Sequence, residues 1–127
     1  MSWQAYVDTS LIGTGDVDQA AIFNSEGTSV WATSTNFNVT PQELKDIVAG
    51  FKDAEKVQSS GVHVAGVKYM TIKADDSSIY GKKGREGVII RKTKQALLVA
   101  HYPATVQPGT ATNTVEKLGD YLIGVGY

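Results

Sequence analysis

Five short strand-like segments follow one another in the second half of the sequence, at residues 62–65, 68–74, 78–82, 88–91 and 95–101. Only a few residues, rich in Gly, Asp and Lys, separate each segment from the next, as in tight turns. Strands joined so closely pair as antiparallel neighbours, because a parallel pair needs a crossover of roughly a dozen or more residues. The sequence therefore predicts a mostly antiparallel sheet rather than a parallel nucleotide-binding sheet.

The first half of the sequence adds one more hairpin, within residues 17–33. Two short apolar segments, at residues 20–23 and 29–32, flank the turn Asn24-Ser25-Glu26-Gly27. A turn of this composition between apolar runs is a hairpin signature. We expect these segments to form two paired strands.

Helical spacing of apolar residues occurs at both ends of the chain. An N-terminal helix over residues 2–12 is indicated by Trp3, Tyr6, Val7, Ser10 and Leu11, with Gly13 and Gly15 as its stop. After Pro103 and Pro108-Gly109 break the strand pattern, a last helix is indicated by Ala111, Val115, Leu118 and Leu122. We expect one helix at each end of the sheet-forming region.

The clearest local signal is a capping box at Thr40-Pro41-Gln42-Glu43. Thr40 is placed to cap the helix, Pro41 suits the first helical position, and Glu43 reaches back to the cap amide. The apolar stripe that follows is Leu44, Ile47, Val48 and Phe51. A polar stretch at residues 55–60 then leads to the run of strands.

Strands joined by hairpins and flanked by terminal helices predict an α+β fold with a central, mostly antiparallel β-sheet. Hydrophobic residues make up 42% of the chain and charged residues 20%, which is ordinary for a globular domain. With 127 residues and no linker-like stretch, we expect a single domain over residues 1–127.

Several classes of protein are disfavoured by what the sequence lacks. It contains no cysteine, so disulfides and thiolate chemistry are excluded and a reducing compartment fits. Residues 1–6 lack the basic and apolar parts of a signal peptide, and no apolar run is long enough to span a bilayer. We expect a cytoplasmic monomer with no metal, cofactor or nucleic acid bound.

No residue pattern nominates a catalytic group. His63 and His101 lack a second histidine at metal-ligand spacing, and Gly13-Thr14-Gly15 lacks the ending of a phosphate loop. The turn Gly81-Lys82-Lys83-Gly84 is suited to hold a phosphate between two lysines, but it is also typical of a solvated hairpin. A binding module is therefore favoured over an enzyme.

The charges are unevenly distributed although the formal net charge is only -1. No Lys or Arg precedes Lys45, whereas seven of the 12 lie between Lys73 and Lys94. This distribution predicts one basic surface, which would steer the protein towards an acidic partner.

Five aromatic residues lie where a folded chain could gather them, near its two ends and on the second predicted strand: Trp3, Tyr6, Trp31, Tyr121 and Tyr127. If the terminal helices pack side by side, these rings line one shallow groove. Exposed Trp and Tyr suit a polyproline II ligand, because they offer apolar faces with an N–H or O–H at the rim. From spacing alone, the alternative that they belong to the core stays open.

The chain also resembles the profilin family, particularly its fungal members. The resemblance rests on the opening Met1-Ser2-Trp3-Gln4-Ala5-Tyr6-Val7-Asp8 with Gly13-Thr14-Gly15, on Ser78-Ile79-Tyr80-Gly81-Lys82 and Ala100-His101-Tyr102-Pro103, and on the closing residues 118–127. It implies a central antiparallel sheet with the N- and C-terminal helices on one face and smaller helical elements on the other.

The same resemblance implies three sets of binding residues. Proline-rich segments, such as those of formins, would be bound by Trp3, Tyr6, Trp31, Tyr121, Leu122 and Tyr127, where Tyr121 stands at a position that is commonly histidine in vertebrate members. Monomeric actin would be bound by Lys68, Thr71, Lys73, Lys82, Val88, Ile90, Val106, Gln107, Gly109, Thr112, Asn113 and Lys117. Phosphoinositide headgroups would be bound by Lys73, Lys82, Lys83, Arg85, Arg91, Lys92 and Lys94, in competition with actin.

The function that the resemblance implies is a non-enzymatic, two-site adaptor. It would promote nucleotide exchange on actin and deliver actin to proline-rich partners, regulating filament assembly. Two alternatives remain at this point. One is a small regulatory domain with buried aromatics and partners unrelated to actin; the other is a phosphate-processing enzyme that uses the Lys82-Lys83 turn and His101.

Overall fold

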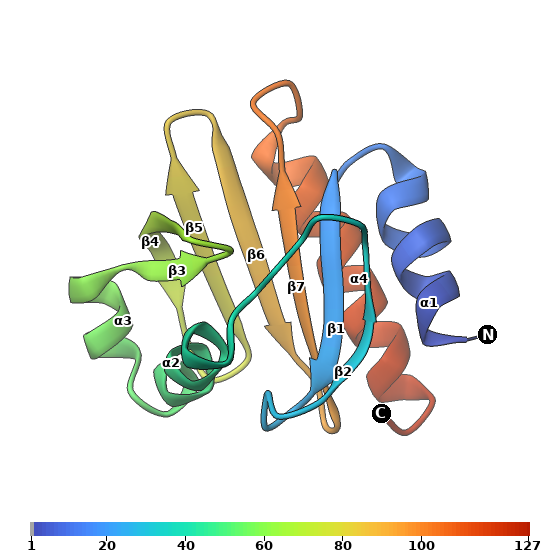
Figure 1. The fold of residues 1–127 in the computed structure, drawn as a ribbon, viewed down its shortest axis with the longest axis horizontal. Coiled ribbons are helices and arrows are strands. Elements are labelled where there is room, and N and C mark those ends of the chain that lie inside the picture. The colour runs from blue at the N-terminus through green and yellow to red at the C-terminus, as the bar shows by residue number, and fades with distance from the viewer. Residues whose placement is uncertain (1) are drawn as a thin grey trace.

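The computed structural model describes residues 2–127 and contains a seven-stranded sheet in the order β2-β1-β7-β6-β5-β4-β3 (Figure 1). All neighbouring strands pair antiparallel. The strands are β1 (Gln19–Asn24), β2 (Val30–Thr33), β3 (Val62–Val64), β4 (Val67–Ala74), β5 (Ser78–Lys83), β6 (Glu86–Lys92) and β7 (Ala96–Tyr102). The antiparallel sheet and its hairpins, predicted from the sequence, are confirmed.

Helices cover both faces of this sheet. The helices and helical turns are α1 (Trp3–Ala5), η1 (Tyr6–Leu11), η2 (Ile12–Thr14), α2 (Pro41–Lys52), α3 (Ala54–Ser60) and α4 (Pro108–Gly124). The N-terminal helix and α4 lie side by side on one face, and α2 and α3 lie on the other (Figure 1). The α+β arrangement predicted for the chain is therefore confirmed.

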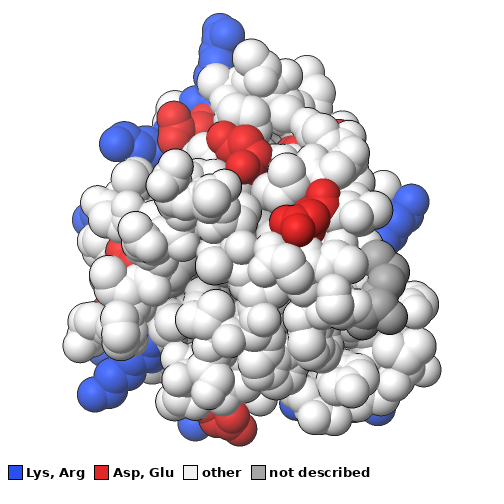
Figure 2. All heavy atoms as spheres, turned by 45° about the vertical axis from the view of Figure 1, so that its right-hand side comes forward, with Lys and Arg blue, Asp and Glu red and all other residues white. Residues whose placement is uncertain are grey.

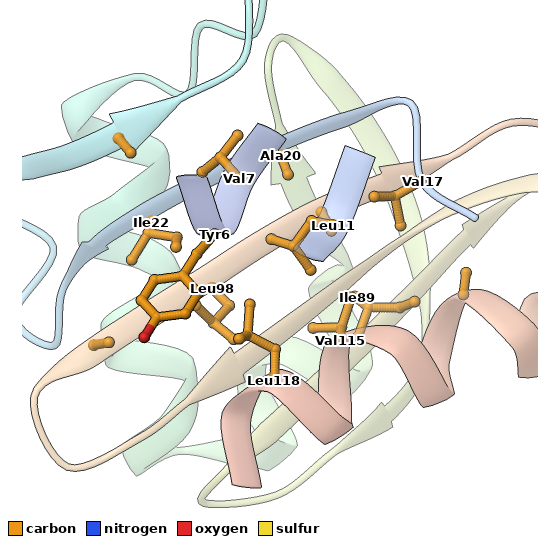
Figure 3. Close-up of a cluster of buried hydrophobic side chains, with 14 of the residues drawn as sticks. Tyr6, Val7, Leu11, Val17, Ala20, Ile22, Ile89, Leu98, Val115 and Leu118 are labelled. Carbon is orange, nitrogen blue, oxygen red and sulfur yellow. The ribbon is translucent and has the colours of Figure 1, made fainter. Parts of the chain in front are cut away.

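Strand β7 is the centre of the core because helices cover it on both faces. The side chains of Ala96, Leu98 and Ala100 belong to the cluster under the terminal helices. Leu97 and Val99 belong to the cluster under α2 and α3. In the first cluster, Leu11, Leu98 and Leu118 approach one another from the N-terminal helix, β7 and α4 (Figure 3).

The N-terminal helix is less regular than the spacing of its apolar residues predicted. The α-helical turn α1 passes into a π-helical segment, η1, and then into a 3₁₀ turn, η2. Gly15 ends the helix with a left-handed backbone, at a φ of 78°, which glycine adopts without steric cost. Of the two predicted stop residues, Gly13 lies inside the 3₁₀ turn and Gly15 terminates it.

The predicted capping box of α2 is present, and its carboxylate does more than cap. Glu43 accepts hydrogen bonds from the backbone N–H groups of Thr40 at 2.9 Å, Ala65 at 3.0 Å and Gly66 at 2.8 Å. Ala65 and Gly66 have positive φ angles of 51° and 83°. Glu43 therefore fixes the turn between β3 and β4 on the start of α2.

The polar stretch at residues 55–60 forms the helix α3, which the sequence did not reveal. Asp53 caps it by accepting a hydrogen bond from the backbone N–H of Lys56, and only Val57 of its residues is buried. A single buried residue gives no periodic apolar stripe. Thr71 Oγ1 on β4 donates to the carbonyl oxygen of Val57 at 2.7 Å, which ties α3 to the sheet.

We expect Glu43→Ala to lower the free energy of unfolding by about 2–4 kcal/mol, because the N–H groups of Ala65 and Gly66 lose a charged acceptor. Urea denaturation of the two proteins measures the difference. The control is Gln42→Ala, which removes an exposed hydrogen bond to Asp46 and should cost less than about 0.5 kcal/mol. Equal losses for the two variants would contradict the role given to Glu43 in holding the β3–β4 turn.

Candidate functional site

Five aromatic side chains from the two ends of the chain and from β2 lie together; we call Trp3, Tyr6, Trp31, Tyr121 and Tyr127 the aromatic cluster. Trp3 is its centre, with ring centroids 4.6 Å from Trp31, 5.0 Å from Tyr127 and 5.6 Å from Tyr6. The Tyr127 ring meets Trp3 edge-on, at 88°. Tyr121 lies 6.2 Å from Tyr6. The structure thus brings together rings that the sequence separates widely.

Exposure within this region decides which side chains a ligand can touch. Tyr121 and Tyr127 are 54% and 41% exposed, and Trp3 and Trp31 are half-buried against the core. Leu122 is only 1% exposed. The prediction that Leu122 contacts a proline-rich ligand is therefore wrong, because its side chain packs into the core beneath α4.

Tyr6 is the least exposed ring of the aromatic cluster, at 9%. Burial, followed by hydrogen bonding with Tyr121, raises the pKa of the Tyr6 hydroxyl above its ordinary value. Tyr6 therefore stays a neutral phenol, and its contact with Tyr121 joins the N-terminal helix to α4 at the edge of the exposed rings.

A buried arginine, paired with two carboxylates of α4, holds this helix against the sheet. Arg91 on β6 contacts Glu116 at 3.2 Å and Asp120 at 3.1 Å, and Ser78 Oγ donates to Glu116 at 3.1 Å. Gly119 makes room for the arginine, because a Cβ there would lie 2.7 Å from Arg91 Cγ. The prediction that Arg91 binds phosphoinositides is wrong, since its side chain is 10% exposed and already paired.

A second exposed surface lies where β4, β5 and the start of α4 meet. A hollow of about 200 Å³ there is lined by Ile72, Tyr80, Lys82, Pro108 and Thr112, among others. Next to it, Lys73 Nζ lies 5.1 Å from the centre of the Tyr80 ring. We call this region the β4–α4 surface.

Most residues predicted to bind actin are accessible. Those on or around the β4–α4 surface are Lys73, Lys82, Val106, Gln107, Gly109, Thr112, Asn113 and Lys117, whereas Lys68 and Thr71 line a neighbouring hollow against α3. Val88 and Ile90 are both 0% exposed within the core under α2 and α3, but Val88 also lines the hollow of the β4–α4 surface. The prediction that Ile90 contacts actin is therefore wrong, and that for Val88 stays a prediction.

Sequence reasoning missed three apolar residues of this surface, Met70, Ile72 and Tyr80. Met70 is 73% exposed and Ile72 is 61% exposed, although both are large apolar residues within strand β4. The register of β4 on β5 shifts between Thr71 and Lys73, so simple alternation along the strand does not hold there. The sequence held one signal for this exposed apolar surface, namely large apolar residues that stand next to lysines.

The seven basic residues of the middle segment do not form the single basic surface predicted. Lys83 and Arg85 lie at the β5–β6 turn, whereas Lys92 and Lys94 lie at the other end of β6, about 20 Å away for a seven-residue strand. Figure 2 shows one face on which Lys and Arg lie towards the periphery, while Asp and Glu lie mostly on its upper half. The prediction of one basic surface is wrong.

The two histidines have different surroundings. His63 is exposed, whereas His101 lies between the carboxylates of Asp18 and Glu86, with Nε2 at 3.0 Å from Glu86 Oε1. Both ring nitrogens can donate at once only in the imidazolium form.

Among residues 2–127, no three imidazole or carboxylate groups are arranged to hold a metal ion. Within the same part of the chain, no helix is both long and apolar enough to cross a bilayer.

Buried Tyr69 faces the same carboxylates. Its ring centroid lies 6.3 Å from that of His101. Burial, reinforced by the negative charges of Glu86, Asp18 and Glu43, raises the pKa of Tyr69 to about 12. The folded protein therefore holds this phenol protonated above the pH at which an unfolded tyrosine ionises.

The fold and the two exposed surfaces are those of a small α+β binding protein, and comparison with known proteins identifies which kind. A family model described as Profilin matches residues 1–127. Profilins of Schizosaccharomyces pombe and Saccharomyces cerevisiae are each 54% identical over 127 residues, which covers 100% of this chain and of theirs. The chain belongs to the profilin family, and its resemblance to fungal members is confirmed.

Solved structures agree with this assignment. A crystal structure of Schizosaccharomyces pombe profilin has a TM-score of 0.96 at 54% identity and covers 99% of this chain and 100% of its own. Mouse profilin IIa in complex with a double repeat from the FH1 domain of mDia1 has a TM-score of 0.81 at 24% identity, with 100% of both chains covered. At that identity the mouse structure shows a common fold.

We expect the stability of the protein to fall between pH 10 and pH 12 and expect Tyr69→Phe to remove part of that fall. The unfolded chain loses the tyrosine proton near pH 10 and the folded chain only near pH 12, so rising pH favours unfolding by about 1.4 kcal/mol per pH unit. Urea denaturation at pH 8, 10, 11 and 12 measures the slope. Parallel curves for the two proteins would contradict the assignment to Tyr69.

Proposed function

We propose that this profilin is a two-site adaptor that binds monomeric actin on the β4–α4 surface and proline-rich segments of formins on the aromatic cluster. The observation that carries the proposal is the gathering of partly exposed Trp and Tyr rings from both chain ends. We also infer that it acts in the cytoplasm as one monomeric domain, promotes actin nucleotide exchange without enzymatic activity of its own, and needs no cofactor.

The chemistry of the aromatic cluster matches a polyproline II helix. Proline rings stack on flat indole faces, and the carbonyl groups of the ligand, which are unpaired within that helix, accept from indole N–H and phenol O–H groups. Trp3 and Trp31 supply two adjacent faces, and Tyr121 and Tyr127 supply exposed hydroxyls. The ligand is already extended in solution, so binding costs it little conformational entropy.

The β4–α4 surface supplies what a protein interface needs: apolar anchors bordered by charge. Met70 and Ile72 offer exposed apolar area, and Lys73 and Lys82 lie beside them. Such anchors usually carry most of the binding energy of an interface. Charges at the rim determine the association rate and the choice of partner. An acidic partner such as actin fits this arrangement.

Because the two surfaces lie at different parts of the molecule, both partners can be held at once. A bound proline-rich segment would then raise the effective concentration of actin near its own chain. Promotion of nucleotide exchange would follow if this profilin binds better to actin with an open nucleotide cleft, since a ligand shifts a conformational equilibrium by its differential affinity.

A phosphoinositide site is favoured at one end of the sheet only. Lys68, Lys82 and Lys83 line a hollow of about 490 Å³ together with Ser59 and Ser60, and Arg85 follows in the adjacent turn. Each cation near an anionic surface contributes roughly 1 kcal/mol. Because Lys68 and Lys82 also belong to the proposed actin site, lipid and actin would compete.

We expect Trp31→Ala to weaken binding of a decaproline peptide at least about tenfold, since Trp31 supplies one of the two adjacent indole faces and Trp residues are frequent anchors of such interfaces. Titration followed by tryptophan fluorescence measures the affinity, and Tyr121→Ala, at an exposed position, should weaken it as well. Unchanged affinity in both variants would contradict the proposed site and favour a regulatory domain with buried aromatics.

We expect Lys82→Glu to weaken binding of monomeric actin at least about tenfold and to leave decaproline binding unchanged, because a like charge would then face an acidic partner. Fluorescence anisotropy with labelled actin measures the first quantity. The matched control is Lys52→Glu, which makes the same charge change at an exposed position on α2. Equal effects of the two substitutions would point to net charge rather than to this surface.

A further inference from the structure

The helix that precedes Tyr127 sets its position only in part. Helix α4 ends at Gly124, and Gly126 has a positive φ of 97°, so the chain turns sharply before Tyr127. The Tyr127 ring nevertheless stands edge-on against Trp3, with centroids 5.0 Å apart. The C-terminal turn of α4 holds the backbone of this segment through the bond from Gly126 N–H to the carbonyl oxygen of Ile123 at 3.1 Å, and further bonds come from outside α4.

The β6–β7 turn holds them through side-chain and backbone hydrogen bonds. Thr93 Oγ1 donates to the main-chain oxygen of Tyr127 at 2.7 Å, and the backbone N–H of Gln95 donates to the same oxygen. Gln95 Nε2 donates to the carbonyl oxygen of Gly126 at 2.8 Å. On the α4 side, Tyr127 N–H donates to the carbonyl oxygen of Leu122 at 2.8 Å.

The turn that makes these bonds is itself held firmly. The backbone N–H of Ala96 donates to Thr93 Oγ1 at 3.0 Å, and the backbone N–H of Thr93 donates to the carbonyl oxygen of Ala96 at 2.9 Å. Ser25 N–H, from the β1–β2 turn, donates to the carbonyl oxygen of Gln95 at 2.9 Å. Thr93 is buried, and the carbonyl oxygen of Ala96, at 3.3 Å from Thr93 Oγ1, is a more distant acceptor than the main-chain oxygen of Tyr127.

We infer that Thr93 and Gln95 are positioning residues for the proline-rich ligand: they hold Tyr127 against Trp3 and so complete the aromatic cluster before the ligand arrives. This inference rests on the proposed proline-binding function and extends it to two residues outside the aromatic cluster. A Tyr127 ring that is free to move would have to be ordered when the ligand binds, and ordering a side chain lowers affinity.

The test uses the full chain and a double-mutant cycle. Gln95→Ala removes an exposed side-chain bond and should weaken decaproline binding by about three- to tenfold, while actin binding stays unchanged. In a Tyr127→Ala background, Gln95→Ala should change decaproline affinity by less than about 1.5-fold, because the residue acts only through Tyr127. A purely structural role would weaken binding in both backgrounds.

Matched variants separate positioning from loss of stability. Gln19→Ala removes the same kind of bond, from Gln19 Nε2 to the carbonyl oxygen of Asn36 at 3.1 Å, at the other end of β1, and should leave decaproline affinity unchanged. Thr93→Ser keeps the hydroxyl and should retain decaproline affinity. Thr93→Val removes the hydroxyl and should weaken decaproline binding. Failure of Thr93→Val to fold would leave the Gln95 cycle as the deciding measurement.

A readout without ligand distinguishes this inference from the proposed function. The NMR signals of the Tyr127 ring should be displaced by the adjacent Trp3 ring in the wild type, and Gln95→Ala should shift them towards unstructured values. Unmoved signals, or unchanged decaproline affinity in Gln95→Ala, would overturn the inference. A wild type that does not bind decaproline would overturn the proposed function, and the ligand part of this inference with it.

Discussion

The burial of β7 on both faces is the constraint on which the rest of the structure depends. The side chains of Ala96 to Ala100 are completely buried, alternately towards the terminal helices and towards α2 and α3. A strand covered on both sides needs two helical layers, and the chain provides one from its two ends and one from its middle. The two ends must therefore meet on the same face, and that meeting creates the aromatic cluster.

Small residues on the terminal-helix side shape that face. Ala20, Ala96, Ala100 and Ala111 are fully buried in the cluster under α4 and the N-terminal helix, and their small size lets these helices lie close to the sheet. The larger Trp and Tyr side chains are then left at the edge, where they contact one another and remain partly exposed. The aromatic cluster is therefore partly exposed because the space between the terminal helices and the sheet is too narrow for its rings.

The sequence predicted the parts of the structure that local chemistry determines. Short turns specified the antiparallel sheet, Thr40 and Glu43 specified the start of α2, and Gly15 specified the end of the N-terminal helix. Helix α3 was missed because only Val57 is buried in it. The separation of Lys83 from Lys92 could have been foreseen, since the predicted strand between them is too long for the two charges to share one patch.

Burial was the property that sequence and resemblance predicted least well. Val88, Ile90 and Leu122 were transferred by position from a family pattern, and position does not say which side of a strand or helix faces the core. Arg91 was counted as a surface charge, yet its partners Glu116 and Asp120 lie on α4, distant in sequence. Only the packing of α4 on β6 reveals that this charge is paired and buried.

Helix α4 connects the two proposed binding surfaces in one rigid element. Its first turn, at Pro108 and Thr112, lines the hollow of the β4–α4 surface, and its last turns carry Tyr121 and lead to Tyr127. A 17-residue helix is about 25 Å long, which is enough to keep two macromolecular partners apart. The Arg91 ion pairs hold α4 near its middle, so the spacing between the surfaces is fixed by the fold and does not depend on either partner.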